Sequence, residues 1–286
     1  MAAPTGRGFY CWHVAKCEGG DLSKIVQKCK DAGVSWLAVK AGDQGRPWTQ
    51  FSKELVDTLH AGGVQVFGWS YDVPTTYKDV LGRTISNPGV LRKQAVVIKR
   101  VADMGADGFI IDAESEWDRA IHPDDEATAY GKEVASLGLS KDFLVGDAPW
   151  PLVSYHASFP FTAFGKWVAF RTPQVYWTAM KLDKNHKVVG PVDDSCERYA
   201  FSWDTYETWV KHGRKPPAPE AVCPHLPGGS AFTDGRCVVK PSELAYFEAF
   251  AAARGNPGVL YWVWDACPED IWTALVSKTV PEYGTK

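Results

Sequence analysis

Apolar and polar residues alternate along the chain with two different periods. Short runs rich in β-branched and aromatic residues predict strands near residues 8–14, 35–42, 64–71, 107–114, 142–149, 172–177, 220–225 and 257–265. Apolar residues at helical spacing predict helices over 21–32, 49–61, 87–104, 123–137, 195–212 and 241–254, a weaker one near 153–168 and a last one near 268–278. Strands that alternate with helices form a parallel sheet, so the pattern predicts an α/β protein.

The number of strand–helix units indicates the architecture. Eight units within 286 residues predict a single (β/α)8 TIM-type barrel, and no linker or repeat divides residues 1–286 into more than one domain. A doubly wound open sheet is the alternative, but it usually carries a glycine-rich phosphate turn after the first strand. The segment GFYCWHVAKCEGG, residues 8–20, is not such a turn, which favours the barrel.

The composition narrows the classes of partner. Apolar residues make up 45% of the chain and charged residues 23%, as in ordinary soluble domains, and a net charge of -3 gives no reason to expect nucleic acid. No apolar run approaches the roughly 18 residues of a membrane span, and the N-terminus has no apolar signal-peptide core. We therefore expect a monomer made in the cytoplasm, with no membrane partner. Seven scattered cysteines without a C-x-x-C pair predict free thiols, with Cys223 and Cys237 as the pair if any bond exists.

The candidate chemistry begins where the fourth predicted strand ends in FIIDAESEW, residues 109–117. Active sites of α/β barrels lie at the carboxyl ends of the strands. Because alternate side chains of a strand share a face, Asp112 and Glu114 point the same way, with Ile110 one layer deeper. Two carboxyls held together at the mouth have separated pKa values, which suits the acid and base roles of glycoside hydrolysis. The alternatives are a helix-capping pair, a metal site, or simple partners for a lysine.

Other strand ends carry aromatic and acidic residues. Aromatic rings suit the apolar faces of sugars, and carboxyl or phenol groups suit their hydroxyls. The alternative for any single tryptophan is a place in the core. Together with the carboxylate pair, this pattern predicts a carbohydrate cleft whose substrate-binding residues are Tyr10, Trp69, Tyr71, Asp147, Gln174, Tyr176, Trp177, Trp262 and Asp265.

The segment DGFIIDAE, residues 107–114, resembles the D-G-x-D-x-D-x-E signature of family 18 chitinases, with Ile110 in place of the middle Asp. The resemblance implies that Glu114 is the general acid and that Asp112 orients the substrate acetamide. GVLYWVW (258–264) is similar to that family's last strand, which implies that Trp262 floors the cleavage subsite. QVYW (174–177) resembles its sixth strand, which implies that Tyr176 contacts the acetamide.

A second resemblance concerns the first half of the chain. AVKAGDQG (38–45), with the D-x-E on the fourth strand, resembles family 25 lysozymes of the bacteriophage-lysin type, although Tyr10 stands where that family has an active-site Asp. Together the resemblances imply a glycosidase that cleaves β-1,4-linked N-acetylated glycan, with peptidoglycan as the expected substrate and the bacterial cell wall as the place of action after release. The alternatives are a chitinase-like enzyme and a barrel that binds glycan without cleaving it.

The expected mechanism is substrate-assisted, because no second carboxylate is evident across the barrel from Glu114. The 2-acetamido oxygen of the substrate would attack, and configuration would be retained. If the product is inverted, Asp147 or Asp265 becomes the expected base. The histidines form no metal-binding pattern, so we expect no metal and no cofactor, and no G-x-S-x-G elbow is present. A Schiff base at Lys40 is the remaining alternative, without a phosphate-binding glycine motif to accompany it.

Overall fold

Eight parallel strands form the centre of the protein in the computed structural model, which describes residues 3–178, 192–211, 223–233 and 238–284. In chain order they are β1 (Gly6–Cys11), β2 (Val34–Asp43), β4 (Gln65–Asp72), β7 (Gly108–Ala113), β8 (Leu144–Asp147), β9 (Phe170–Arg171), β10 (Gly228–Ser230) and β11 (Gly258–Trp262). They pair in the order β10-β11-β1-β2-β4-β7-β8-β9. Single parallel bridges from Arg171 to His225 and from Gln174 to Gly228 join the two ends of this order. The predicted barrel is confirmed.

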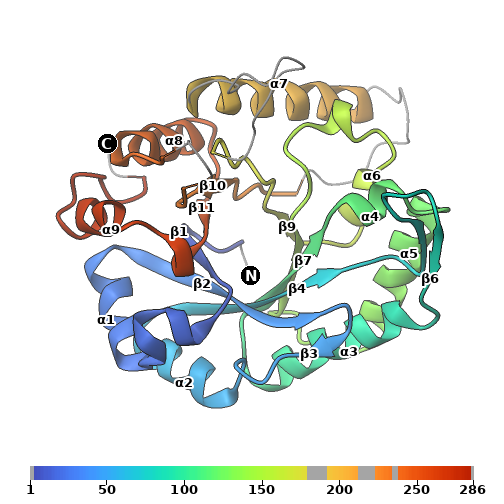
Figure 1. Cartoon of the computed structure of the whole chain (residues 1–286), viewed down its shortest axis with the longest axis horizontal. Helices are drawn as coiled ribbons and strands as arrows, with labels where there is room; N and C mark the ends of the chain where they lie inside the picture. The colour runs from blue at the N-terminus through green and yellow to red at the C-terminus, as the bar shows by residue number, and fades with distance from the viewer. Residues whose placement is uncertain (1–2, 179–191, 212–222, 234–237, 285–286) are drawn as a thin grey trace.

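Helices surround these strands (Figure 1). Those near the predicted positions are α1 (Leu22–Asp31), α2 (Lys53–Ala61), α3 (Val90–Asp103), α5 (Pro123–Ala135), α7 (Val192–Lys211), α8 (Pro241–Ala253) and α9 (Glu269–Val276). The weak helix predicted over 153–168 is instead a 3-10 turn, η3 (Val153–Tyr155), followed by the short α6 (Phe161–Gly165). Pro160 stands just before α6 and cannot continue a helix through that point, because it has no backbone N–H.

Two strand predictions were misplaced. The sixth strand ends at Arg171, before the predicted 172–177, and the seventh begins at Gly228, after the predicted 220–225. Pro173 and Pro224 lie inside the two predicted windows and have no N–H to donate to a sheet, whereas β10 is the sequence GGS, which carries no strand propensity. Residues 220–222 lie outside the described part of the chain.

Smaller elements follow the carboxyl ends of the strands. They are η1 (Val14–Lys16), η2 (Glu18–Gly20), β3 (Arg46–Pro47), the antiparallel hairpin of β5 (Thr76–Lys78) and β6 (Thr84–Ser86), α4 (Ser115–Asp118) and η4 (Trp264–Ala266). Several of them carry residues of the candidate site, because the βα loops of a barrel gather at one face.

The core has two layers, and membership of a layer tells which way a strand residue points. The inner cluster fills the barrel and consists of Tyr10, Trp36, Ala38, Phe67, Trp69, Ile110, Leu144, Ala148, Phe170, Leu226, Leu260 and Val263. The outer cluster lies between the strands and the helices and includes Ile111 and Val145. Ile110 and Ile111 are neighbours in β7 but belong to different layers, as the alternation of a strand requires. Among the described residues, no helix is long and apolar enough to cross a membrane.

Candidate active site

Strand β7 brings the two predicted carboxylates to the mouth of the barrel. Ile110 is buried in the inner cluster, so Asp112 and Glu114, two and four residues later, continue the inward-facing row. Gln174 lies three residues after the end of β9. It donates from Nε2 to Asp112 Oδ1 at 3.1 Å and to Glu114 Oε1 at 3.4 Å. The same nitrogen lies 3.2 Å from the Ala148 carbonyl oxygen. One amide therefore ties the two carboxyl groups together, as the shared-face argument requires.

The surroundings raise the pKa values of both carboxyl groups. Burial, and next the charge of Glu114, raise the pKa of Asp112 well above its usual range. Burial also raises the pKa of Glu114, against the lowering effect of its hydrogen bond from Gln174. Lys40 opposes the shift at both groups by its positive charge. A carboxyl whose pKa is raised beside a second carboxyl is the arrangement that a general acid needs.

Lys40 places a basic side chain at this mouth. Its buried side chain lies on β2, with Nζ 4.0 Å from the centre of the Trp69 ring and 3.2 Å from Asp43 Oδ2. Aromatic faces and carboxylates both attract an ammonium group, and Lys40 has one of each as a neighbour. The structure thus shows electrostatic contacts for Lys40, which the Schiff-base alternative did not include.

Trp262 stands in the middle of an aromatic group beside the carboxylates. Its half-buried ring, at the end of β11, lies 5.2 Å from the ring of Tyr10, 5.5 Å from Trp69, 5.6 Å from Trp12 and 6.2 Å from Tyr176, centre to centre. The charges of Asp112 and Glu114 act on Tyr176, whose pKa burial raises well above the usual range. These rings and the two carboxyl groups therefore belong to one site.

Tyr10 is the residue that the predicted resemblance to family 25 lysozymes aligns with an active-site carboxylate. The side chain is buried, and its hydroxyl lies 3.2 Å from Thr172 Oγ1. Burial raises its pKa, so the phenol stays neutral and cannot act as the missing anion. Tyr10 contributes a polar edge to the site but no negative charge.

Asp147 does not face the site. It pairs with Ile111 across β7 and β8, and parallel neighbours in register point to the same side, so its carboxylate lies in the outer layer. It is 0% exposed and 3.8 Å from Arg171 Nε, and burial raises its pKa to about 6. The prediction that Asp147 binds sugar or activates water is therefore corrected.

Trp177 also lies outside the candidate site. Its buried ring belongs to the outer cluster, 5.1 Å from the Phe247 ring, and its Nε1 donates to Glu243 Oε2 at 3.3 Å. Two residues of the helix α8 thus hold the indole. Its predicted role in sugar binding is corrected to one in packing, since strand-end position alone did not distinguish the two faces.

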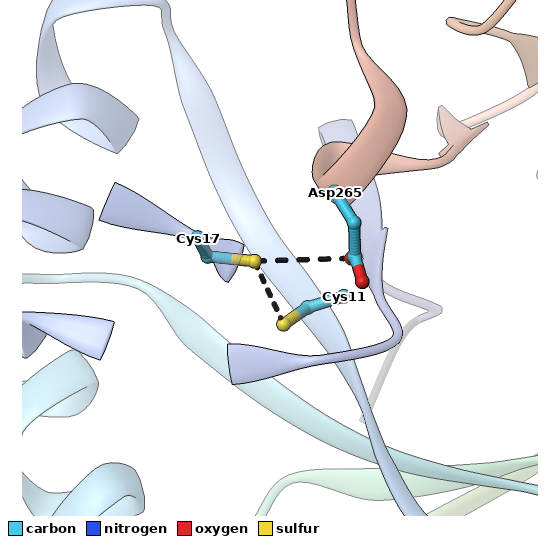
Figure 2. Close-up of side chains that lie close together, drawn as sticks. All are labelled: Cys11, Cys17 and Asp265. Carbon is cyan, nitrogen blue, oxygen red and sulfur yellow. Dashed lines mark hydrogen bonds between the residues drawn. The ribbon is translucent and has the colours of Figure 1, made fainter. Parts of the chain in front are cut away.

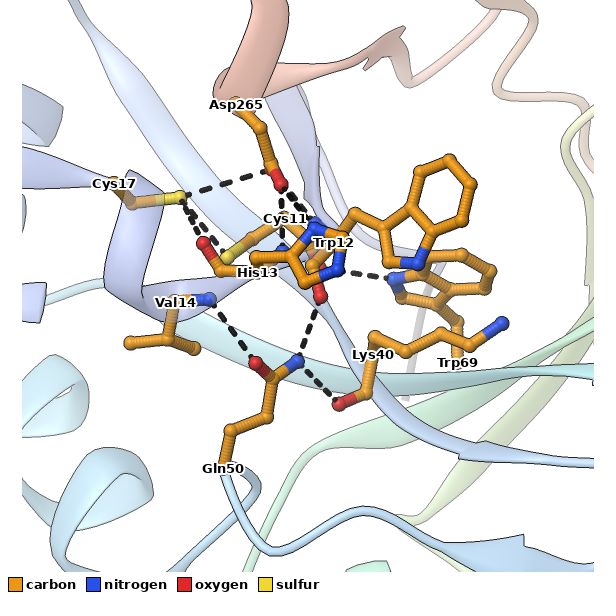
Figure 3. Close-up of polar contacts among 9 residues, drawn as sticks. All are labelled: Cys11, Trp12, His13, Val14, Cys17, Lys40, Gln50, Trp69 and Asp265. Carbon is orange, nitrogen blue, oxygen red and sulfur yellow. Dashed lines mark hydrogen bonds and ion pairs between the residues drawn. The ribbon is translucent and has the colours of Figure 1, made fainter.

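Asp265 holds the loop after β1 in place. Its Oδ1 accepts from the backbone N–H of Trp12 at 2.9 Å, and its Oδ2 accepts from that of His13 at 2.7 Å and lies 3.0 Å from His13 Nδ1 (Figure 3). Gln50 grips the same loop, because its Nε2 donates to the Trp12 carbonyl at 2.8 Å and its Oε1 accepts from Val14 N at 3.1 Å. Asp265 was predicted to bind substrate hydroxyls or to act as a base. The structure gives it instead the task of positioning Trp12, which is 41% exposed at the rim.

Tyr71 reaches the rim from β4, where it is paired in register with Asp112. Its hydroxyl donates to Glu116, which also accepts from Arg119 Nη2 at 3.2 Å. Glu116 is thereby paired with Arg119, just past the end of α4, and its charge contributes to the raised pKa of Glu114. Sequence reasoning did not find Gln50 or Arg119, and it placed Gln174 in the cleft without its bridging contact, because these roles depend on loops that meet only in the folded chain.

Comparison with known proteins places the fold. The sequence matches no protein-family model, and no curated protein matches it. The structure is similar to the spore cortex-lytic enzyme SleL of Bacillus cereus, with a TM-score of 0.60 and 11% identity over 96% of this chain and 75% of that one. It is also similar to a family GH18 chitinase of Cycas revoluta in complex with allosamidin, with a TM-score of 0.58 and 8% identity over 96% and 98% of the two chains. An endo-β-1,4-mannanase of Thermotoga petrophila has a TM-score of 0.58 and 10% identity over 91% of this chain and 68% of its own.

The fold is a (β/α)8 barrel similar to those of the three enzymes. Identities this low establish architecture and not substrate, and the three proteins are named for different polysaccharides, so the chemistry has to be argued from the residues of the barrel. The predicted resemblance to family 18 is supported at the level of the fold. The predicted resemblance to family 25 lysozymes stays a prediction.

Proposed function

We propose that this protein is a glycosidase that hydrolyses β-1,4-linked N-acetylated glycan, with Glu114 as the general acid and Asp112 as the group that holds the substrate's 2-acetamido arm. The observation that carries the proposal is the contact of one Gln174 nitrogen with both carboxyl groups, at 3.1 and 3.4 Å. The contact keeps an acid with a raised pKa and a second carboxylate on the same side of the bound sugar. The aromatic ring of Trp262 beside them offers the flat surface on which a pyranose rests.

The arrangement favours a substrate-assisted mechanism. Glu114 donates its proton to the glycosidic oxygen, and the acetamido oxygen of the same sugar attacks the anomeric carbon from the other side. Asp112 accepts the acetamido N–H and balances the positive charge that develops there. A protein nucleophile would have to come from across the barrel, and the two candidates from the sequence are Asp147, which faces outward, and Asp265, which is bound by two backbone amides. Water then opens the intermediate with retained configuration.

Peptidoglycan is the proposed substrate, reached at the bacterial cell wall after release of the protein, which acts as a monomer. The similarity to a cortex-lytic enzyme supports this choice, and the similarity to a chitinase supports chitin oligomers as the second candidate. The deep position of Ile110, where family 18 has a further Asp, favours the alternative of a barrel that binds such glycans without cleaving them.

The experiment compares Glu114→Gln with Glu116→Gln on purified cell walls, by turbidity, and on chitin oligomers, by product analysis. The first substitution should lower the rate by about 10²–10⁴-fold, the usual contribution of a general acid, while oligosaccharide binding persists. The second removes a carboxylate two residues away that is paired with Arg119, and it should keep most of the activity. More than a tenth of the activity in Glu114→Gln would exclude Glu114 as the acid. Binding without cleavage by the unmodified protein would establish the non-catalytic alternative.

The mechanism has its own test. Proton NMR should show the retained anomer as the first product, allosamidin and thiazoline analogues should inhibit, and glycans without the N-acetyl group should not be cleaved. An inverted first product would contradict attack by the acetamido group.

A further inference from the structure

Two buried thiols face each other at the end of β1. Cys11 ends β1, Cys17 follows the turn η1, and their Sγ atoms are 3.1 Å apart (Figure 2). Unbonded carbon atoms, which are smaller than sulfur, prefer about 3.5–4.0 Å. The two sulfur atoms are therefore closer than ordinary packing would place them, in a loop whose ends are already fixed.

The loop between the two thiols is held from both sides, so their approach does not depend on a mobile segment. Asp265 binds the backbone of Trp12 and His13, and Gln50 binds Trp12 and Val14. A disulfide requires the sulfur atoms to come closer by only about 1 Å, since its bond length is about 2.04 Å. Both thiols are nearly inaccessible, with 3% and 1% of their residues exposed.

We propose that Cys11 and Cys17 form a disulfide bond when the chain folds in the presence of a low-molecular-weight disulfide. One thiolate attacks the disulfide reagent and releases one reagent thiol, and the other thiolate then attacks the mixed disulfide and releases the second. The two cysteines lose two protons and two electrons, and the reagent gains both. The bond ties the segment that carries Trp12, whose ring lies 5.6 Å from Trp262. Its formation is independent of the proposed function.

A metal ion is the other occupant that this cluster suggests, because Asp265 joins the two cysteines in a group of three ligand atoms within 4.8 Å of one another. Two features speak against it. The Asp265 oxygens already accept from two backbone amides. The adjoining cavity is only ≈ 10 Å³, and apolar side chains such as Leu37 and Leu55 line it.

The sequence provides a direct readout. Trypsin cuts after Arg7, Lys16 and Lys24, so Cys11 and Cys17 fall in separate peptides, 8–16 and 17–24, that stay together only if the bond exists. The protein is unfolded, refolded in oxidised and reduced glutathione, alkylated in denaturant, digested and analysed by mass spectrometry. We expect the joined pair of peptides, and its loss after dithiothreitol. Closing so short a loop should raise the melting temperature by about 4 °C.

The controls are Cys17→Ser, which should show neither the joined peptides nor a melting temperature that depends on dithiothreitol, and Cys29→Ser, which should show both. Separate alkylation of Cys11 and Cys17 in the oxidised wild-type protein would overturn the proposal. Retention of one zinc ion per chain, with both thiols protected until a chelator is added, would overturn it in favour of a metal site. None of these measurements needs a substrate, so their outcome is separate from that of the glycosidase assays.

Discussion

Replacement of Gln174 by Met tests how the two carboxyl groups work together. The substitution keeps the length of the side chain and removes the amide that donates to Asp112 and Glu114. A hydrogen bond to a charged partner contributes about 1.5–3 kcal/mol. Both carboxyl groups carry charge in the transition state, so the loss should lower kcat/KM by about 10- to 100-fold.

The same substitution should move the pH profile in a defined direction. Burial raises the pKa of Glu114, and the hydrogen bond from Gln174 partly offsets that rise. Without the bond the pKa rises further, so the acid stays protonated to higher pH. The basic limb of kcat/KM, which reports the loss of that proton, should therefore shift upward.

The assay is the pH dependence of hydrolysis of a chitin oligomer or of soluble peptidoglycan fragments, whichever the enzyme cleaves. Gln27→Met, a change of the same kind at an exposed position whose amide donates to Asp31, serves as the control and should leave the profile where it was. A Gln174→Met enzyme with a normal basic limb and normal kcat/KM would refute the shared-donor reasoning. A lower rate at an unchanged limb would mean that Gln174 only packs.

Two further substitutions examine the cleft. Trp262→Ala should weaken oligosaccharide binding by about 1–3 kcal/mol in a calorimetric titration, which is the scale of a lost stacking surface. The melting temperature should change little, because the ring is half-buried. An unfolded variant would show that the ring belongs to the core. Asp112→Asn should abolish activity yet stabilise the fold, because burial and the charge of Glu114 disfavour the Asp112 carboxylate. When folding raises the pKa of a carboxyl group, that group destabilises the fold increasingly as the pH rises from its pKa in the unfolded state through its pKa in the folded state. The gain in melting temperature from Asp112→Asn should therefore be larger at about pH 8 than at about pH 4. A gain in melting temperature that is the same at both pH values would contradict the buried charge.

Periodicity predicted the barrel because the strands and helices bury apolar faces in two layers, one inside the barrel and one between the strands and the helices. It failed where the strand is short or built of glycine. The sequence GGS of β10 has no side chains that signal a strand, and it forms one because the closing of the barrel supplies partners on both sides, Leu260 and the bridge to Gln174. Tertiary closure, not local propensity, fixes that strand.

The part of the candidate site that depends on the geometry of a single strand was predictable. The positions of Asp112 and Glu114 on one inward row follow from their spacing to Ile110. The orientation of Asp147 followed from the same rule, but only once the register with Ile111 was known, since the sequence does not state which residue of β8 enters the barrel. Loop contacts such as that of Gln50 with Trp12 join segments 38 residues apart and leave no local signal.

Ile110 explains why the donor has to come from Gln174. The residue is 0% exposed and belongs to the inner cluster together with Trp69, so an apolar side chain lies one layer beneath Asp112. A carboxylate over an apolar layer is costly unless a donor reaches it from the side. Gln174 is that donor, and because its nitrogen also reaches Glu114, the group that stabilises the charge of Asp112 at the same time sets the distance between the acid and the acetamido-binding carboxylate.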